Sequence, residues 1–445
     1  MRFGRSLFFA LALFALCVPA SASAQDVPAP MVTGPIEGGS HGYPWNHTLY
    51  SLSGKNFDYT ENEYFYSGTA QDLSNGTSAP YTSRMLVRLP SRKRDFSGAV
   101  LVEWLNVTSQ SDFETAWPVE AQWLMRHGIG YVGVSAQMAG VCCANTTLQG
   151  WDMQRYGPLL HPGDNFSYDI YSQATRALRG PQPEGSVDPL AGFRLRKLIT
   201  TGASQSASRL TDFVNDGYNR GQIDLYVITR GGGPYDDFST PIFQINEENN
   251  EVPQPDGPNY VAWEEGGAAH APTPWWDYIT AEQNRDLGVP NGATAINTGC
   301  QPINRASVDF TSRAMSLWVN RYLRDGTMPP SAPRVERDDL GNIVRDDNGL
   351  AVGGLRQPFV QVPIAFNSSE KCPLFGTHED WNADKITSLY ATHHEYVVKL
   401  RRRTFRQVKR GFLIPGDRRR VIKRAKAFTA PWAGGCDPCV APRGL

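Results

Sequence analysis

The chain has 445 residues, and its 43 Lys and Arg nearly balance its 44 Asp and Glu, so the formal net charge is −1. This balance gives no global electrostatic reason to expect nucleic acid as a partner. The length exceeds one ordinary domain, but it fits a single large α/β domain with insertions and a sizeable core.

The N-terminal residues have the pattern of a cleavable export signal. Two arginines precede an apolar run over residues 7–18, and Ala22-Ser23-Ala24 supplies the small residues that precede a cleavage site. The apolar run is shorter than the roughly 20 residues that a membrane-spanning helix needs. We therefore expect residues 1–24 to be a signal peptide and residues 25–445 to be a secreted or periplasmic protein without a membrane span.

Short apolar runs alternate with helix-like segments up to about residue 270. Runs rich in Val, Leu and Ile predict strands over residues 85–89, 99–103, 131–135, 197–201, 225–229, 242–246 and 261–264. Apolar residues at helical spacing predict helices over residues 117–127, 168–178 and 205–215. Such alternation is typical of an α/β fold with a mostly parallel sheet and helices on both faces. We place this core at about residues 60–270.

The remaining residues, about 271–445, predict a C-terminal extension or a lid, and the pattern does not separate the two. Helices are expected over residues 308–323 and 386–401, and turns over 338–354. Four tryptophans could line an apolar or sugar-binding cleft, although tryptophan is as often a core residue. They are Trp104, Trp117, Trp275 and Trp276.

Six cysteines follow the expected signal peptide, and an even number in an exported protein favours disulfides. Six cysteines allow fifteen pairings, and the sequence does not choose among them. Cys436 and Cys439 form a single C-x-x-C pair without a second pair nearby, which favours a structural role over a redox or zinc site. We expect no metal and no cofactor.

The strongest chemical signal is the sequence Gly202-Ala203-Ser204-Gln205-Ser206, which follows a predicted strand and opens a predicted helix. A nucleophile elbow needs small residues two before and two after its serine, because the turn is tight. Gly202 and Ser206 meet this demand, although the usual second glycine is replaced by Ser206. We therefore expect Ser204 to be the nucleophile.

A serine nucleophile needs a histidine base, and in this fold the chain order is serine, acid, histidine. Four histidines follow Ser204: His270, His378, His393 and His394. His270 follows the last predicted strand in a loop of small residues, so we expect it to be the base. His378 is the reserve candidate.

The acid is expected at the end of the predicted strand over residues 242–246, where Glu247 and Glu248 follow each other. We favour Glu248 over Glu247. Asp236 and Asp237 remain possible, because some enzymes of this architecture place the acid one strand earlier.

Two N–H donors are needed to stabilise the oxyanion of the reaction. The first is expected from Gln205, which follows the nucleophile. The second is expected from the loop after the strand over residues 99–103, where Asn106 or Val107 offers a backbone N–H or Asn106 its side-chain amide.

Several segments taken together resemble a family of mostly bacterial "alpha/beta hydrolase domain" proteins of about this size. The segments are Val102-Glu103-Trp104-Leu105-Asn106-Val107, Val132-Gly133-Val134-Ser135-Ala136-Gln137, His161-Pro162-Gly163-Asp164, Gly202-Ala203-Ser204-Gln205-Ser206, Ala269-His270-Ala271 and Gly353-Gly354-Leu355-Arg356. The resemblance implies the hydrolase fold and an esterase-like activity, and it implies no particular substrate.

These observations lead us to expect hydrolysis of a small-molecule or polymer ester through an acyl-enzyme, with Ser204, His270 and Glu248 as the triad. An acyltransferase or a peptidase would use the same residues. A catalytically silent binding protein on the same scaffold is the alternative from another class.

Overall fold

The computed structural model describes residues 26–288, 302–372 and 374–442. The strands are β1 (Met31–Thr33), β2 (Ser53–Gly54), β3 (Phe57–Gln71), β4 (Ser78–Pro90), β5 (Ala99–Trp104), β6 (Gly130–Val134), β7 (Lys197–Ala203), β8 (Leu225–Thr229), β9 (Ile242–Glu247), β10 (Tyr260–Glu265), β11 (Ala365–Ser368) and β12 (Thr377–Asp380).

The helices are α1 (Trp117–Arg126), α2 (Met138–Val141), α3 (Leu148–Trp151), α4 (Met153–Tyr156), α5 (Ser167–Arg179), α6 (Gln205–Asn215), α7 (Thr273–Leu287), α8 (Val308–Asp325), α9 (Pro358–Gln361), α10 (Ala383–Leu389), α11 (His393–Arg410), α12 (Pro415–Ala427) and α13 (Ala430–Ala433). Two 3-10 turns, Lys93–Asp95 and Asp164–Phe166, complete the described elements.

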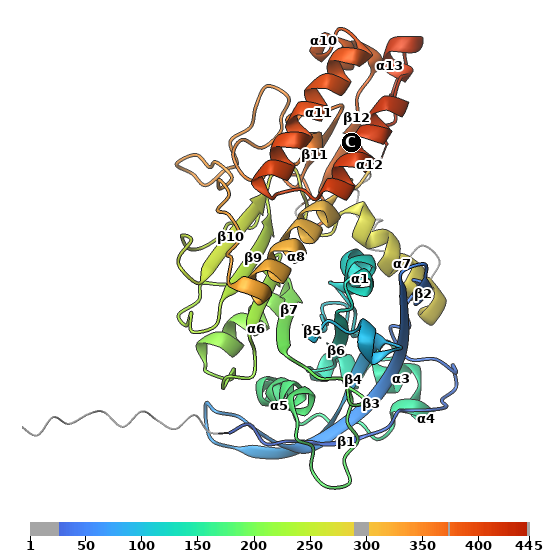
Figure 1. Cartoon of the computed structure of the whole chain (residues 1–445), viewed down its shortest axis with the longest axis vertical. Coiled ribbons are helices and arrows are strands. Elements are labelled where there is room, and N and C mark those ends of the chain that lie inside the picture. Colours follow the sequence, from blue (N-terminus) through green and yellow to red (C-terminus); the bar gives the residue numbers. More distant parts are fainter. Residues whose placement is uncertain (1–25, 289–301, 373, 443–445) are drawn as a thin grey trace, which may run out of the picture.

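One mixed sheet organises the molecule, with the strand order β1-β3-β4-β6-β5-β7-β8-β9-β10 and β2 paired to β3 (Figure 1). The strands β5 to β10 are parallel to one another, whereas β1, β3 and β4 are joined by antiparallel pairing. Helices lie on both sides of the central strands (Figure 1). The predicted α/β fold with a mostly parallel sheet is therefore confirmed.

Alternating side chains of the central strands feed two separate hydrophobic cores. Val100 and Val102 of β5 belong to the core that includes Tyr171 of α5 and Leu210 of α6. Leu101, between them, belongs to the core on the opposite face, with residues of α1, α7 and α8. Because successive side chains of a strand point to opposite faces, each strand is apolar on both sides. Trp104 and Trp117 are fully buried in these cores.

The predicted strand over residues 85–89 is only the end of a longer element, because β3 and β4 form an antiparallel hairpin with a register that runs from Tyr59–Pro90 to Gln71–Ser78. The sequence of β3 is rich in polar residues, which hid it. Its buried carboxylates are neutralised across the hairpin: Glu61 contacts Arg88 at 2.6 Å and Glu63 contacts Arg84 at 2.5 Å. A buried charge is tolerated when it is paired in this way.

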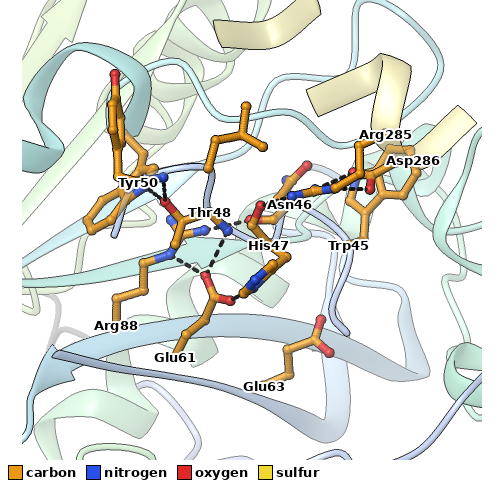
Figure 2. A network of polar contacts seen from close by, with 12 residues as sticks. Trp45, Asn46, His47, Thr48, Tyr50, Glu61, Glu63, Arg88, Arg285 and Asp286 are labelled. Atoms are coloured by element: carbon orange, nitrogen blue, oxygen red, sulfur yellow. Dashed lines mark hydrogen bonds and ion pairs between the residues drawn. The ribbon is translucent and has the colours of Figure 1, made fainter. Parts of the chain in front are cut away.

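A polar network fixes α7 to this hairpin through the N-terminal segment 45–50 (Figure 2). Arg88 donates hydrogen bonds to Glu61 and to the Asn46 carbonyl oxygen, both at 2.6 Å. Arg285 of α7 donates to the His47 carbonyl oxygen, also at 2.6 Å. Helix α7 is therefore held against the sheet at its C-terminal end, which matters because its N-terminal half borders the candidate site.

The C-terminal part divides its contacts between the sheet and itself. Helices α7 and α8 pack on the sheet, whereas α10 to α13 pack around a further core that includes Ile386, Leu400 and Val421 and also takes in Phe310 of α8 and Ala365 of β11. In Figure 1 this helical group rises beyond one end of the sheet. No helix in the described ranges is long and apolar enough to cross a membrane.

The expected helix over residues 386–401 is wrong in its bounds, because two helices, α10 and α11, occupy this stretch. Helix α10 ends at Leu389 and α11 begins at His393. The side chain of Thr392 caps α11 by accepting a hydrogen bond from the Glu395 N–H at 3.1 Å. Such a cap satisfies one of the N–H groups that a helix start leaves unpaired. Sequence periodicity across the break hid this boundary.

Disulfides join Cys142 to Cys143 and Cys436 to Cys439, and Cys372 is also disulfide-bonded. The two cysteines of the C-x-x-C pair are thus bonded to each other. The expected signal peptide, residues 1–24, lies outside the described residues.

Candidate active site

Ser204 occupies a sharp turn between β7 and α6. Its backbone has φ = 58° and ψ = −119°, a conformation that a residue other than glycine rarely adopts. The Ser204 N–H donates a hydrogen bond to the Thr229 carbonyl oxygen of the neighbouring strand at 3.2 Å. A strained turn from a strand into a helix is the geometry that presents a serine hydroxyl above the sheet.

The small residues around Ser204 are required by close packing in the turn. A Cβ at Gly202 would lie 2.9 Å from Leu210 Cδ1 and 3.0 Å from the Ser206 carbonyl oxygen. Ser206 is completely buried, and its hydroxyl accepts from the Ala203 N–H at 3.0 Å and donates to the Ala203 carbonyl oxygen at 2.9 Å. The serine that replaces the usual glycine therefore ties the turn together.

His270 is held by a carboxylate from the adjacent strand. Its Nδ1 lies 2.6 Å from Oε1 of Glu247, the last residue of β9, and the Glu247 side chain is only 3% exposed. Burial alone would raise the pKa of Glu247, but the neighbouring His270 and Arg230 lower it below its usual value. Glu247 is therefore ionised, and its contact leaves Nε2 as the free ring nitrogen of His270.

The preference for Glu248 as the partner of His270 is wrong. Glu248 turns to the other side of the strand end, where Oε2 accepts the Gly267 N–H at 2.6 Å. Its Oε1 accepts the Ser369 N–H at 2.8 Å and an Arg345 guanidinium N–H at 3.1 Å. Glu247 ends the strand and Glu248 begins the turn after it, and of the two carboxylates it is that of Glu247 that contacts His270.

The other candidates for acid and base have different partners. The Asp237 carboxylate accepts hydrogen bonds from Ser239 within its own exposed loop, and Asp236 is also exposed. His378 is buried on β12, with Nδ1 3.0 Å from Asn367 Oδ1 and Nε2 2.9 Å from Asp380 Oδ1. Asp236 and Asp237 therefore do not take the place of Glu247 beside His270. Both ring nitrogens of His378 already have partners, so His378 does not replace His270 as the base.

Arg230, directly after β8, is a site residue that the sequence analysis missed. Its Nη1 donates hydrogen bonds to the carbonyl oxygen of His270 and, at 3.4 Å, to that of Ala269. Burial lowers the pKa of Arg230, and the nearby carboxylates of Glu247 and Glu265 oppose this change. Arg230 therefore fixes the backbone that carries His270.

The two expected oxyanion donors have different surroundings. Gln205 begins α6, where backbone N–H groups point out of the helix. The Asn106 N–H instead donates to the Phe113 carbonyl oxygen at 3.1 Å, and the Asn106 amide donates to the Ala203 carbonyl oxygen at 2.8 Å. Asn106 supports the turn, which makes its backbone N–H unsuitable as a donor. The Val107 N–H also has a partner, because it donates a long hydrogen bond of 3.4 Å to Gln205 Oε1, but that partner is a side chain that borders the cleft and can turn away.

An apolar cavity of about 230 Å³ opens beside Ser204 and His270. Its walls are mostly aromatic and aliphatic side chains from α7 and from two loops: Phe113, Trp275, Trp276, Ile279, Leu374 and Phe375. Of the four tryptophans considered from the sequence, Trp275 and Trp276 therefore do border a cavity.

A second, more open cleft of about 800 Å³ meets the same residues from the other side. Polar groups predominate in it, among them Gln137, Asp164, Arg209, Asn250 and Glu251. Ser204, His270 and Arg230 border both spaces, whereas Val107 and Gln205 border only the cleft.

Among the described residues, no three His, Cys, Asp or Glu side chains gather in a way that could hold a metal ion. The chemical groups that the structure brings together at this site are a serine hydroxyl in a strained turn, an imidazole with an ionised carboxylate, and backbone N–H groups at a helix start.

A family model described as an alpha/beta hydrolase domain matches residues 32–423. A search of curated proteins finds no match. Among solved structures, similarity is found to a cold-adapted esterase from an Arctic intertidal metagenomic library, with 13% identity, a TM-score of 0.27 and coverage of 46% of this chain and 77% of that one.

Two further structures are similar to the same degree. A serine hydrolase without a lid from Xanthomonas campestris has 12% identity and a TM-score of 0.28, with 44% of this chain and 83% of that one covered. Brefeldin A esterase, a bacterial homologue of human hormone-sensitive lipase, has 14% identity and a TM-score of 0.24, with coverage of 42% and 43%. At such low scores these likenesses carry no argument about the site.

Proposed function

Because the chain belongs to the alpha/beta hydrolase domain family, we propose that it is an exported serine hydrolase that cleaves carboxylic esters through an acyl-enzyme. The observation that carries this proposal is the 2.6 Å contact between Glu247 and His270 beside a serine in a strained turn. An oriented histidine next to such a serine is the arrangement that activates a hydroxyl for attack.

In the proposed reaction, Ser204 Oγ attacks the ester carbonyl carbon while Nε2 of His270 takes the hydroxyl proton. Glu247 holds the tautomer with the proton on Nδ1 and stabilises the imidazolium that forms. The N–H groups of Gln205 and Val107 stabilise the negative oxygen. His270 then returns the proton to the leaving alcohol. Water attacks the acyl-enzyme with His270 again as the base, which releases the acid and restores Ser204.

The proposed reaction requires that Nε2 of His270 reach Ser204 Oγ when substrate is bound. Catalytic hydrogen bonds of this kind often become short only in the complex with substrate. The shared position of both residues on the cavity and on the cleft supports such an approach.

Labelling with a fluorophosphonate probe tests the proposal. The unmodified protein should be labelled, Ser204→Ala should not be, and Ser388→Ala, an exposed serine on α10, should be labelled as the unmodified protein is. Equal labelling of Ser204→Ala would contradict the assignment of the nucleophile. Labelling without turnover of any ester would favour a silent binding protein, and product formation only with an added alcohol acceptor would favour an acyltransferase.

The proposed export rests on the pattern of residues 1–24 and is supported by the disulfide between Cys436 and Cys439, because such bonds persist in oxidising compartments. Sequencing the N-terminus of the mature protein tests it. A protein that begins near residue 25 is expected, and an intact Met1 in the cytoplasmic fraction would contradict the proposal.

A further inference from the structure

Two spaces of opposite character meet at the candidate nucleophile. The cavity is enclosed by aromatic and aliphatic groups such as Phe113, Trp276 and Ile279, whereas the cleft is bordered by charged and amide groups such as Asp164 and Arg209. An ester bond placed at Ser204 would have one half in each space.

The cavity is large enough for one small apolar group. Its volume of about 230 Å³ is below the roughly 300 to 1,000 Å³ of pockets that hold a whole drug-sized ligand. An apolar protein cavity of about 150 Å³ already binds benzene. A single ring, or a short aliphatic chain of similar bulk, therefore fits the cavity.

The cleft suits a larger and more polar group. Its volume of about 800 Å³ is open to solvent, and the ion pair of Arg209 with Asp164 at 3.4 Å lies within it. Side chains of Gln137 and Asn250 add donors and acceptors of hydrogen bonds. Such a surface offers few apolar contacts to an apolar group, so it would bind one weakly. Its polar side chains can form hydrogen bonds to the hydroxyl groups of a substrate in place of water.

We propose that the substrate is an amphipathic ester, in which an apolar acyl group about the size of benzoyl occupies the aromatic cavity and a polyhydroxylic alcohol occupies the cleft. This inference rests on the proposed hydrolase function. It names the class of acid and the class of alcohol that the two spaces would select.

The order of steps in the proposed reaction indicates which half of the ester, acyl or alcohol, occupies the cavity and which occupies the cleft. The acyl group stays bound to Ser204 through the covalent intermediate, so the smaller and less open of the two spaces can hold it. The alcohol has to leave before water enters, and the open cleft serves both movements. Val107 and Gln205, the proposed oxyanion donors, border this cleft and lie beside the path of the water.

Four esters test the assignment: methyl acetate, methyl benzoate, 6-O-acetylglucose and 6-O-benzoylglucose. The benzoyl ester of glucose should have the highest kcat/KM, with a preference for benzoyl over acetyl of about tenfold or more, the size that a fitted apolar pocket confers. Benzyl gluconate, which reverses the two halves, should be a poor substrate. A preference for benzyl gluconate over 6-O-benzoylglucose would overturn the assignment, and so would equal rates for all the esters.

A pair of matched variants tests whether the cavity determines the preference for the acyl group and the cleft the preference for the alcohol. Ser109 and Ser208 are both exposed serines, the first bordering only the cavity and the second only the cleft. Ser109→Trp should lower the ratio of benzoyl to acetyl turnover by about tenfold and keep the ratio of glucose to methyl esters. Ser208→Trp should do the reverse. Ser388→Trp, on a distant exposed helix face, serves as the control and should change neither ratio.

The outcomes separate this inference from the proposed function. If the protein is labelled by fluorophosphonate at Ser204 and hydrolyses esters, but both tryptophan variants change the two ratios alike, the amphipathic assignment fails and the hydrolase proposal stands. If neither labelling nor hydrolysis occurs, the proposed function itself fails.

Discussion

Oε1 of Glu247 lies 2.6 Å from Nδ1 of His270; Glu247 ends β9, and His270 lies in the loop that follows the neighbouring parallel strand β10. The register of these strands pairs Glu247 with Glu265, five residues before His270. The short loop that follows then returns the imidazole over the end of β9. The carboxylate and the base are thus brought together by strand pairing and by one loop.

Glu247→Gln should lower kcat/KM for a model ester by about 10³-fold or more, because an amide cannot hold the required tautomer or stabilise the imidazolium. Steady-state kinetics with a p-nitrophenyl ester measures this loss. The matched change Glu248→Gln should leave most of the ester hydrolysis intact and lower the melting temperature, since Glu248 accepts hydrogen bonds from the Gly267 and Ser369 N–H groups. A larger kinetic loss in Glu248→Gln than in Glu247→Gln would reverse the roles.

Arg230→Met should lower kcat by about 10²-fold with little change in KM, the size expected when a reacting group is displaced by about 1 Å. The change removes the hydrogen bonds to the carbonyl oxygens of His270 and Ala269. Comparing kcat with KM separates this positioning effect from substrate binding. A rise in KM alone would show that Arg230 binds substrate instead.

Ser206→Ala should destabilise the protein by about 1 to 3 kcal/mol, because it leaves the buried N–H of Ala203 without its hydroxyl partner. Urea unfolding measures the free energy. The exposed change Ser208→Ala on the same helix is the control and should have almost no effect on stability. Equal stability of both variants would contradict the role given to the Ser206 hydroxyl.

The stability of the protein should fall as the pH rises from about 5 to 8, in part because of Glu265. Burial raises the pKa of this carboxyl to about 8, against the hydrogen bond from Thr311 and the charge of Arg230. The folded state therefore keeps a proton over a pH range in which the unfolded state has lost it, so stability is full below the unfolded pKa and is lost as pH approaches 8.

Glu265→Gln removes this titration and keeps an oxygen that can accept from the Thr311 hydroxyl, 2.7 Å away in the native protein. The free energy of unfolding of this variant, measured at several pH values, should fall less steeply than that of the native protein. Parallel pH profiles would show that Glu265 is ionised in the folded state.

The site was predictable from the sequence wherever it depends on neighbouring residues in the chain. The strand, the turn at Ser204 and helix α6 follow from local pattern, and His270 follows from chain order. The choice between Glu247 and Glu248 depends on which face of β9 meets the loop after β10, which only strand pairing determines. Arg230 donates a hydrogen bond to the carbonyl oxygen of His270, forty residues further along the chain, and no sequence pattern predicts that contact.

The fold shows the same division. The apolar parallel strands were recognisable, because burial on both faces leaves continuous runs of Val, Leu and Ile. Most of the β3–β4 hairpin was missed, because its charged residues are neutralised by partners on the opposite strand. The boundary between α10 and α11 was missed because the capping role of Thr392 depends on local backbone geometry.

Trapping the acyl-enzyme tests directly whether Ser204 is the nucleophile. The protein is mixed with p-nitrophenyl benzoate, quenched in acid within the first turnover and digested, and the peptides are examined by mass spectrometry. A benzoyl group is expected on Ser204 in the native protein and is expected to be absent from Ser204→Ala. A benzoyl group on another residue, or a burst of p-nitrophenol that persists in Ser204→Ala, would contradict this assignment.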